Sequence, residues 1–238
     1  MTVDTQSCLP PTIEMAVALA AATECALHGL FVEDIDLLSV AKLPFIQEVT
    51  LSGGRPRSMD DRQLQRSLNA FSSQFRQALE NQAEKFSLSC SYSVVRGHRQ
   101  RLELDELDQS AFLIHGQALR PRARIHGQQR IVLLGEKLLP LLPALEALLQ
   151  NSSALRTELL VLAQPGQGQD SILAELQELL SNHANVVPVV LPADSLFRLA
   201  AARSNAIDCI IASRVPGIIS LAQVLQLASC PVIIAANS

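Results

Sequence analysis

Residues 206–236 decide the fold class, and they read AIDCIIASRVPGIISLAQVLQLASCPVIIAA. Two nearly continuous apolar runs, at 206–213 and 230–236, have the length and composition of buried β-strands. The stretch between them, at 218–228, has the composition of a helix. Strands that are apolar on both faces are typical of a parallel sheet covered on each side. We therefore expect the two strands to be parallel and joined by a right-handed crossover.

The same alternation extends upstream through the C-terminal half. Further apolar strands are predicted at 131–135, 158–163 and 186–192, and helices are predicted at 141–150, 170–180 and 195–205. Pro188 cannot donate a hydrogen bond to a neighbouring strand, so the strand that contains it is predicted at an edge of the sheet. The C-terminal half is thus predicted to be α/β, a doubly wound parallel five-strand sheet.

The N-terminal half repeats part of this order. Its predicted elements are a helix at 13–26, a strand at 27–34, a long helix at 60–86, a strand at 87–97, a short helix at 99–109 and a strand at 111–116. No opening strand is recognised before residue 13, and no closing helix and strand are recognised after Gly116. We therefore predict a related, truncated α/β domain at 1–118 and a complete one at 128–238.

Composition excludes several functional classes. The net charge is −4, so the chain has no excess of basic residues to bind a nucleic-acid backbone. Aromatic residues make up only 3% of the chain, so few side chains are available to stack on bases. The longest apolar stretch, 131–149, contains three charged residues and two prolines, so no membrane helix is predicted. The N-terminus lacks the pattern of a secretory signal, which makes the cytoplasm the expected location. The five cysteines and five histidines have no metal-binding spacing, and no metal site is predicted.

Several phrases resemble the universal stress protein family in its diverged, tandem bacterial form. They are HGLFVED (28–34), LPFIQEV (43–49), SYSVVRG (91–97) and CPVII (230–234), together with the long helix at 60–86. The resemblance extends over about residues 12–236. It implies a role in stress response and, in members that bind ATP, a glycine-rich loop after the fourth strand of the unit.

That loop departs from the family's pattern in this chain. The corresponding stretch is 212–229, where only Gly217 remains of the glycines that let the backbone approach phosphate. Pro216 removes an amide, and Ile218 and Ile219 place branched side chains where the phosphates would lie. The resemblance therefore implies a nucleotide-binding fold without its phosphate-binding loop.

A second interpretation keeps a nucleotide in a divergent crevice at the carboxyl ends of the strands, where open α/β sheets bind ligands. The candidate residues for AMP or ATP are Gly135, Glu136, Gly166, Gly168, Ser213 and Gly217. Gly135 and Glu136 stand where the family has the acidic residue of its first strand. Gly166 and Gly168 belong to a loop, PGQGQ, that is also explained as a flexible turn.

The sequence favours a non-catalytic protein without a cofactor that acts through protein contacts in stress response. No phosphoryl-transfer or acyl-transfer motif and no pairing of a nucleophile with a base is recognised, so an enzyme is not expected. An AMP- or ATP-binding universal stress protein is the alternative. Because the strand at 230–236 is predicted to be an exposed edge, we also expect a homodimer that covers it.

Overall fold

The computed structural model contains all 238 residues of the chain. The residues that the structure describes are 2–3, 9–43, 45, 47–48, 57–58, 61–98, 111–116, 128–135, 137–151, 156–163, 169–192, 195, 207–214, 220–228 and 230–235. The helices predicted at 99–109 and 195–205 fall outside them, apart from Ser195. So does most of the linker between the two predicted domains, at 117–127, and with it the boundary itself.

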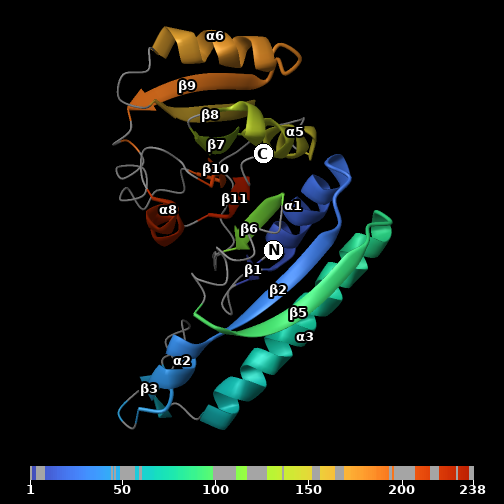
Figure 1. Ribbon diagram of the computed structural model, residues 1–238, viewed down its shortest axis with the longest axis vertical. Coiled ribbons are helices and arrows are strands. Elements are labelled where there is room, and N and C mark those ends of the chain that lie inside the picture. Colours follow the sequence, from blue (N-terminus) through green and yellow to red (C-terminus); the bar gives the residue numbers. More distant parts are fainter. Residues whose placement is uncertain are drawn as a thin grey trace.

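One large sheet runs through both halves of the chain (Figure 1). Its strands are β1 (Thr2–Val3), β2 (Leu27–Asp34), β5 (Cys90–Gly97), β6 (Phe112–Gly116), β7 (Gln128–Leu134), β8 (Arg156–Ala163), β9 (Val186–Pro192), β10 (Cys209–Ser213) and β11 (Val232–Ala235). They lie in the order β5-β2-β1-β6-β11-β10-β7-β8-β9. Every neighbouring pair is parallel except β6 and β11, which are antiparallel. The predicted doubly wound sheet of the C-terminal half is confirmed.

Helices cover both faces of this sheet (Figure 1). They are α1 (Leu9–Ala22), α2 (Ile35–Val40), α3 (Asp61–Lys85), the 3₁₀ turn η1 (Leu139–Leu141), α5 (Leu142–Asn151), α6 (Gln169–Leu179) and α8 (Leu221–Leu227). Helices α1, α3, α5 and α6 share one hydrophobic cluster, and α8 belongs to the cluster on the opposite face. A separate two-stranded sheet, β3 (Gln47–Glu48) with β4 (Arg57–Ser58), lies between α2 and α3 in the chain. Within the described segments, no helix is long and apolar enough to span a membrane.

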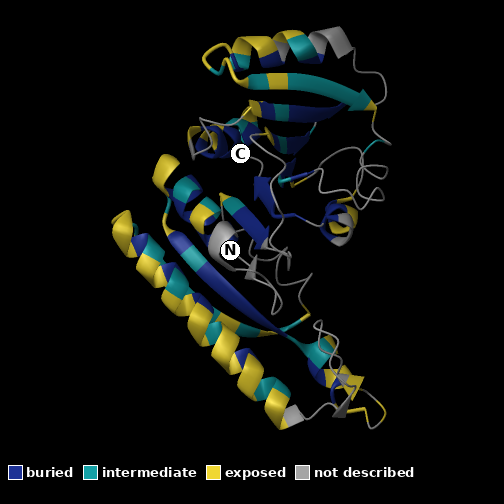
Figure 2. Cartoon of the chain, turned by 180° about the vertical axis from the view of Figure 1, so that it is seen from behind, coloured by how far each residue is buried: buried dark blue, intermediate teal, exposed yellow. Residues whose placement is uncertain are grey.

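The main hydrophobic core joins the two halves. Phe31 and Phe75 of the first half belong to the same buried cluster as Ile131 and Leu145 of the second half. Helix α1 packs against α3 on one side and α5 on the other. The central strands are buried along most of their length, whereas α3 exposes one whole side (Figure 2). The halves therefore share apolar packing as well as one sheet.

The first half is more complete than the sequence suggested. Strand β1 pairs in parallel with both β2 and β6, so the prediction of a missing opening strand was wrong. The strand has only two residues, which is too short to give a periodic signal. With β1 in place, the first half has the strand order of the first four strands of the second half.

The fifth strand position of the first half is taken by the last strand of the chain. Ile233 lies opposite Ile114 of β6 and also opposite Ile211 of β10. Strand β11 is thus hydrogen-bonded on both sides, and the prediction that it forms an exposed edge was wrong. The edges of the sheet are instead β5 and β9, so the homodimer loses the surface from which it was first predicted. The edge position of the strand that contains Pro188 is confirmed.

Candidate functional site

The strand order of the second half creates a switch point between β7 and β10. Chain order runs from β7 through β8 to β9 on one side, and then resumes with β10 and β11 on the other side. Leu134, the last residue of β7, lies opposite Ala212 of β10. In open α/β sheets, ligands bind beyond the carboxyl ends of the two strands that flank such a point. The residues that follow Leu134 and Ala212 are therefore the first candidates for a site.

Two of the predicted site residues meet there. A methyl group built on Gly135 would lie 3.3 Å from the Ser213 hydroxyl oxygen, 3.2 Å from a Leu141 methyl carbon and 3.1 Å from the Lys137 carbonyl oxygen. Ser213 is 4% exposed and Leu141 is fully buried. The space beside Gly135 is thus already filled by protein atoms of η1 and β10. The structure brings Gly135 and Ser213 together, as expected from their places after β7 and at the end of β10.

The remaining candidates lie outside the described residues. These candidates are Glu136, Gly166, Gly168 and Gly217. Pro216, Ile218 and Ile219, which were predicted to block the phosphate loop, also lie outside the described residues. Their predicted roles, in the alternative crevice or in closing the phosphate loop, stay predictions.

Helix α8 follows the switch point and supplies its own N-terminal hydrogen bonds. The Ser220 hydroxyl oxygen accepts a hydrogen bond from the Gln223 amide at 3.3 Å, and the Gln223 side-chain oxygen accepts one from the Ser220 amide at 3.0 Å. This reciprocal pair is a capping box, and it satisfies amides that a bound anion would otherwise use. The sequence Ser-Leu-Ala-Gln carries the signal, although it did not enter the prediction.

In the first half, the equivalent switch point lies between β1 and β6. Val3 is opposite Gly116, and His115 of the same strand is 4% exposed. Residues 4–8 and 117–127, which follow the two strands, are outside the described residues. In the sequence, no glycine pair follows Gly116.

A second polar group lies at the carboxyl ends of β2 and β5. Both the Nε and an Nη of Arg96 donate to one oxygen of Glu33, at 2.9 and 2.6 Å, and Gln65 of α3 donates to the other oxygen at 3.1 Å. The Glu33 side chain is only 10% exposed. Its carboxylate is therefore saturated by protein donors, and it fastens the start of α3 to the two strands. The pairing joins residues far apart in the sequence and was not predicted.

More exposed polar contacts continue from this group. The Asp34 carboxylate accepts a hydrogen bond from the Asp36 amide at 2.9 Å and caps α2. His98 and the Asp36 carboxylate lie 3.3 Å apart, and both side chains are more than half exposed. An exposed pair of this kind contributes little stability, about 1 kcal/mol or less. These contacts shape the end of the strand pair and do not assemble reactive groups.

His28 contacts two serines of the adjacent strand. Its Nδ1 lies 2.8 Å from the Ser91 hydroxyl oxygen, and its Nε2 lies 3.0 Å from that of Ser93. Serine beside histidine is one requirement of a hydrolytic site, but such catalysis also needs donors aimed at an oxyanion. Here the three side chains form a cross-strand ladder between β2 and β5. His28 is therefore a half-buried histidine whose two ring nitrogens both have hydrogen-bond partners.

Two of the thiols, those of Cys209 and Cys90, are poor nucleophiles. Burial raises the pKa of the Cys209 thiol well above its ordinary value. Burial also raises the pKa of Cys90, and the negative charge of Glu80 acts in the same direction. A raised pKa keeps a thiol protonated near neutral pH and therefore unreactive. In the parts of the chain that are described, no group of three His, Cys, Asp or Glu side chains could hold a metal ion.

No protein-family model matches the sequence, and no curated protein matches it either. Among solved structures, the chain is similar to a universal stress protein from Archaeoglobus fulgidus DSM 4304, with a TM-score of 0.52. The chain shares the fold of a universal stress protein. The alignment covers 100% of this chain and 96% of the archaeal one, at 7% sequence identity. At this identity the likeness establishes the fold alone, and it confirms the architecture that the sequence resemblance implied.

Proposed function

We propose that this is a non-catalytic protein of the universal stress type, diverged and tandem, that acts through protein contacts in the cytoplasm during stress. The proposal includes that the protein binds no nucleotide. The observation that carries it is the packing at the switch point, where Leu141 and Ser213 fill the space beside Gly135. The self-capped start of α8 supports the same conclusion.

An ATP site in this fold needs bare backbone next to the phosphates and free amides at the start of the following helix. Two observations on the described residues around the switch point run against these requirements and support the proposal. A methyl group built on Gly135 would have three protein atoms within 3.3 Å. The first-turn amide of α8 at Gln223 already donates to Ser220. The single glycine of the loop, Gly217, adds no second approach for phosphate.

Protein contact is supported by apolar side chains that remain exposed. Val40, Leu43 and Phe45 are 43%, 42% and 74% exposed and lie within six residues of one another. They belong to the segment around α2 and β3, which projects beyond the end of the main sheet (Figure 1). Large apolar side chains grouped on a projection are suited to a protein partner. We name Val40, Leu43 and Phe45 the apolar tip.

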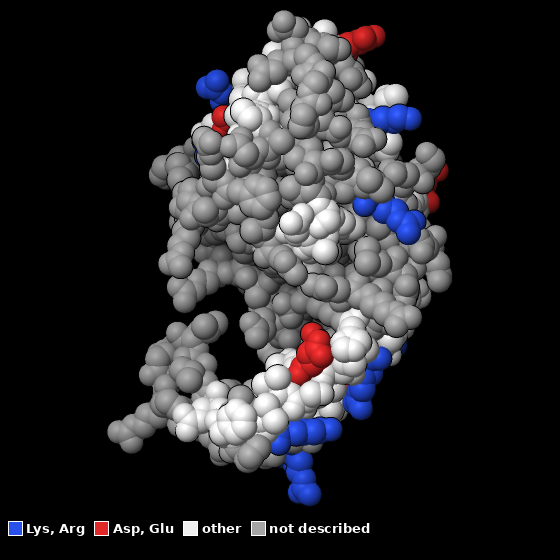
Figure 3. Space-filling view, turned by 60° about the vertical axis from the view of Figure 1, so that its left-hand side comes forward, with Lys and Arg blue, Asp and Glu red and all other residues white. Residues whose placement is uncertain are grey.

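The net charge of −4 favours a protein partner over a nucleic acid. On the face shown in Figure 3, Lys and Arg side chains of the described residues are spread over the upper part and lie closer together at the lower edge, where an acidic side chain accompanies them. Nucleic-acid binding depends on clustered basic side chains that replace counterions along the phosphates.

The proposal predicts that nucleotides leave the thermal stability unchanged. With ATP or AMP at about 5 mM, we expect the midpoint of thermal unfolding to move by less than about 1 °C. A ligand at one hundred times its Kd would stabilise the native state by about 2.7 kcal/mol, which corresponds to about 5–10 °C for a chain of this size. Differential scanning calorimetry measures the shift. A rise of this order with either nucleotide, abolished by Gly135→Leu, would establish the alternative function and overturn this one.

The apolar tip gives a test of the protein contact itself. Phe45→Ser is expected to reduce capture of the partner about tenfold or more, because loss of an aromatic anchor typically costs about 2 kcal/mol or more. Phe86→Ser is the matched control, since Phe86 is also well exposed, at 56%, but lies beyond α3 and outside the tip. Crosslinking with the purified chain in lysate from stressed cells provides the measurement. Equal capture by the native chain and by Phe45→Ser would exclude the tip as the contact.

A further inference from the structure

Among the strands that the structure describes, β5 is one of the two edges of the large sheet. It has eight residues, Cys90–Gly97, and all eight pair with β2 on one side only. The Leu27 amide donates to the Ser89 carbonyl oxygen at 2.8 Å, which fixes the parallel pattern. In that pattern the odd-numbered residues of β5 direct their backbone groups to β2, and the even-numbered residues direct theirs away from the sheet. Long edge strands of this kind pair readily with another strand.

The other edge of the sheet, strand β9, is protected against pairing with a further strand, unlike β5. On β9, the Thr157 amide donates to the Asn185 carbonyl oxygen at 2.9 Å, so the even-numbered residues of β9 point outward. Two of them are Pro188 and Pro192, which offer no amide to a new strand. Strand β5 has no proline and no lysine. Of the two edges, only β9 carries residues that block pairing.

The one charged side chain of β5, that of Arg96, is 58% exposed but is paired with a carboxylate of the neighbouring strand. Arg96 donates two hydrogen bonds to Glu33 on the neighbouring strand, and these engage its charge within the sheet. The remaining residues are neutral, and Val94 is the most exposed apolar side chain of the strand, at 48%. The edge therefore lacks the free charges that usually discourage strand pairing.

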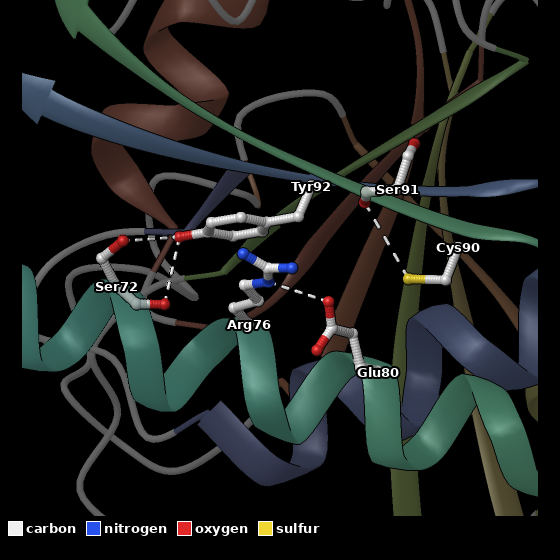
Figure 4. Close-up of polar contacts among 6 residues, drawn as sticks. All are labelled: Ser72, Arg76, Glu80, Cys90, Ser91 and Tyr92. Atoms are coloured by element: carbon white, nitrogen blue, oxygen red, sulfur yellow. Dashed lines mark hydrogen bonds and ion pairs between the residues drawn. The ribbon is translucent and has the colours of Figure 1, made fainter.

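Helix α3 packs against one face of β5 and holds the strand in place (Figure 4). The Tyr92 ring packs edge-on against Phe75 with centroids 5.7 Å apart, and its hydroxyl contacts the Ser72 hydroxyl at 2.8 Å. Arg76 lies beneath the Tyr92 ring and pairs with Glu80 along the helix (Figure 4). These contacts fix the face of the strand, while its outward amides and carbonyls remain in the plane of the sheet. A strand held in its bound conformation loses little entropy when it pairs.

We propose that β5 pairs antiparallel with β5 of a second copy of this chain, across a two-fold axis, and so forms a homodimer with one continuous sheet. A strand that pairs with its own copy in this way forms an isologous interface, in which each contact occurs twice. The outward residues must face one another, so a pairing centred on Ser93 sets Tyr92 opposite the partner's Val94 and Cys90 opposite the partner's Arg96. Aromatic and β-branched residues are favourable cross-strand pairs, and no like charges meet.

The chain already contains one junction of the same kind. Strands β6 and β11 join the two related halves by antiparallel pairing over four residues on each strand. Strand β5 could supply twice that length to a second copy. An extended segment of another protein is the competing occupant, and it would lack the repeated, two-fold contacts that the self-pairing provides. The inference is independent of whether the switch point holds a nucleotide.

The test compares matched lysine variants on the two edges. At about 100 µM, well above a micromolar Kd, the native chain is expected to show about twice the mass of one chain, 25.8 kDa, in light scattering. Val94→Lys should give the mass of a single chain, because two lysines would meet near the axis. Val187→Lys is the control on β9, where the native valine is 39% exposed, and it should remain dimeric. Circular dichroism confirms that both variants are folded.

Hydrogen exchange gives a second readout that needs no variant. The outward amides of residues 90, 92, 94 and 96 should exchange several-fold more slowly at about 100 µM than at about 1 µM, since dimerisation would protect them. A native chain of single mass at the higher concentration, with exchange in β5 independent of concentration, would overturn the proposal. So would a dimer that survives Val94→Lys or is lost in Val187→Lys. Protection of β5 only after another protein is added would assign the edge to that protein.

Discussion

Replacing Gly29 with alanine is expected to lower the free energy of unfolding by about 2–3 kcal/mol, at the upper end of the usual cost of overpacking. Gly29 lies on β2 beneath α3. A methyl group there would approach a Leu79 methyl carbon at 2.4 Å and the Tyr92 ring at 3.0 Å. Leu79 is fully buried, so it cannot turn aside without displacing its neighbours. The close approach of α3 to β2 thus depends on the missing side chain.

Chemical denaturation with far-UV circular dichroism measures the Gly29 effect, and Gly135→Ala is its control. At Gly135 the three nearest atoms are 3.1–3.3 Å from the added methyl group, so we expect a loss of about 1 kcal/mol or less. Leu79→Ala should cost less stability when added to Gly29→Ala than in the native chain, because the new methyl group then occupies space that leucine has vacated. If the two substitutions proved additive, the steric explanation would fail.

The fold was predictable wherever a single segment carried its own signal. The apolar runs at 158–163 and 186–192 became β8 and β9, and the periodic stretch at 60–86 became α3. Strand pairing depends on residues distant in the chain, and there the sequence was less informative. The two-residue strand β1 was missed, and β11 was placed at an edge although it lies between β6 and β10.

In the candidate site, too, some features could be predicted from single segments, and others depend on residues that are distant in the sequence. Gly135 and Ser213 could be placed together because both follow from strand order and from the rule that ligands bind at the switch point. The buried carboxylate of Glu33 could not be found in this way, since its partners Gln65 and Arg96 come from a helix and a strand much later in the chain. The exposed edge of β5 likewise became visible only once the neighbours of every strand were known.

The position of β11 leads to the second large effect, which is expected for Ile234→Pro. Ile234 is fully buried between Leu113 of β6 and Ala212 of β10. Proline removes a ladder donor in the interior of a sheet, and the change also removes a buried side chain, so we expect a loss of about 4 kcal/mol or more. Val190→Pro is the control, because Val190 is on the edge strand β9 with its amide directed away from β8. Its cost should be much smaller.

The decisive measurement is whether Ile234→Pro destabilises the first half of the chain as well as the second. The chain has one tyrosine, Tyr92, and no tryptophan, so tyrosine emission reports on the first half of the chain alone. Ile234 is near the C-terminus, yet its strand closes the sheet of the first half and the core extends across the junction. We therefore expect Ile234→Pro to shift the denaturation midpoint of Tyr92 emission as far as that of far-UV circular dichroism. A Tyr92 transition that stays in place while the circular dichroism transition moves would show that the halves unfold separately, and that β11 is an addition to the first half and not part of its structure.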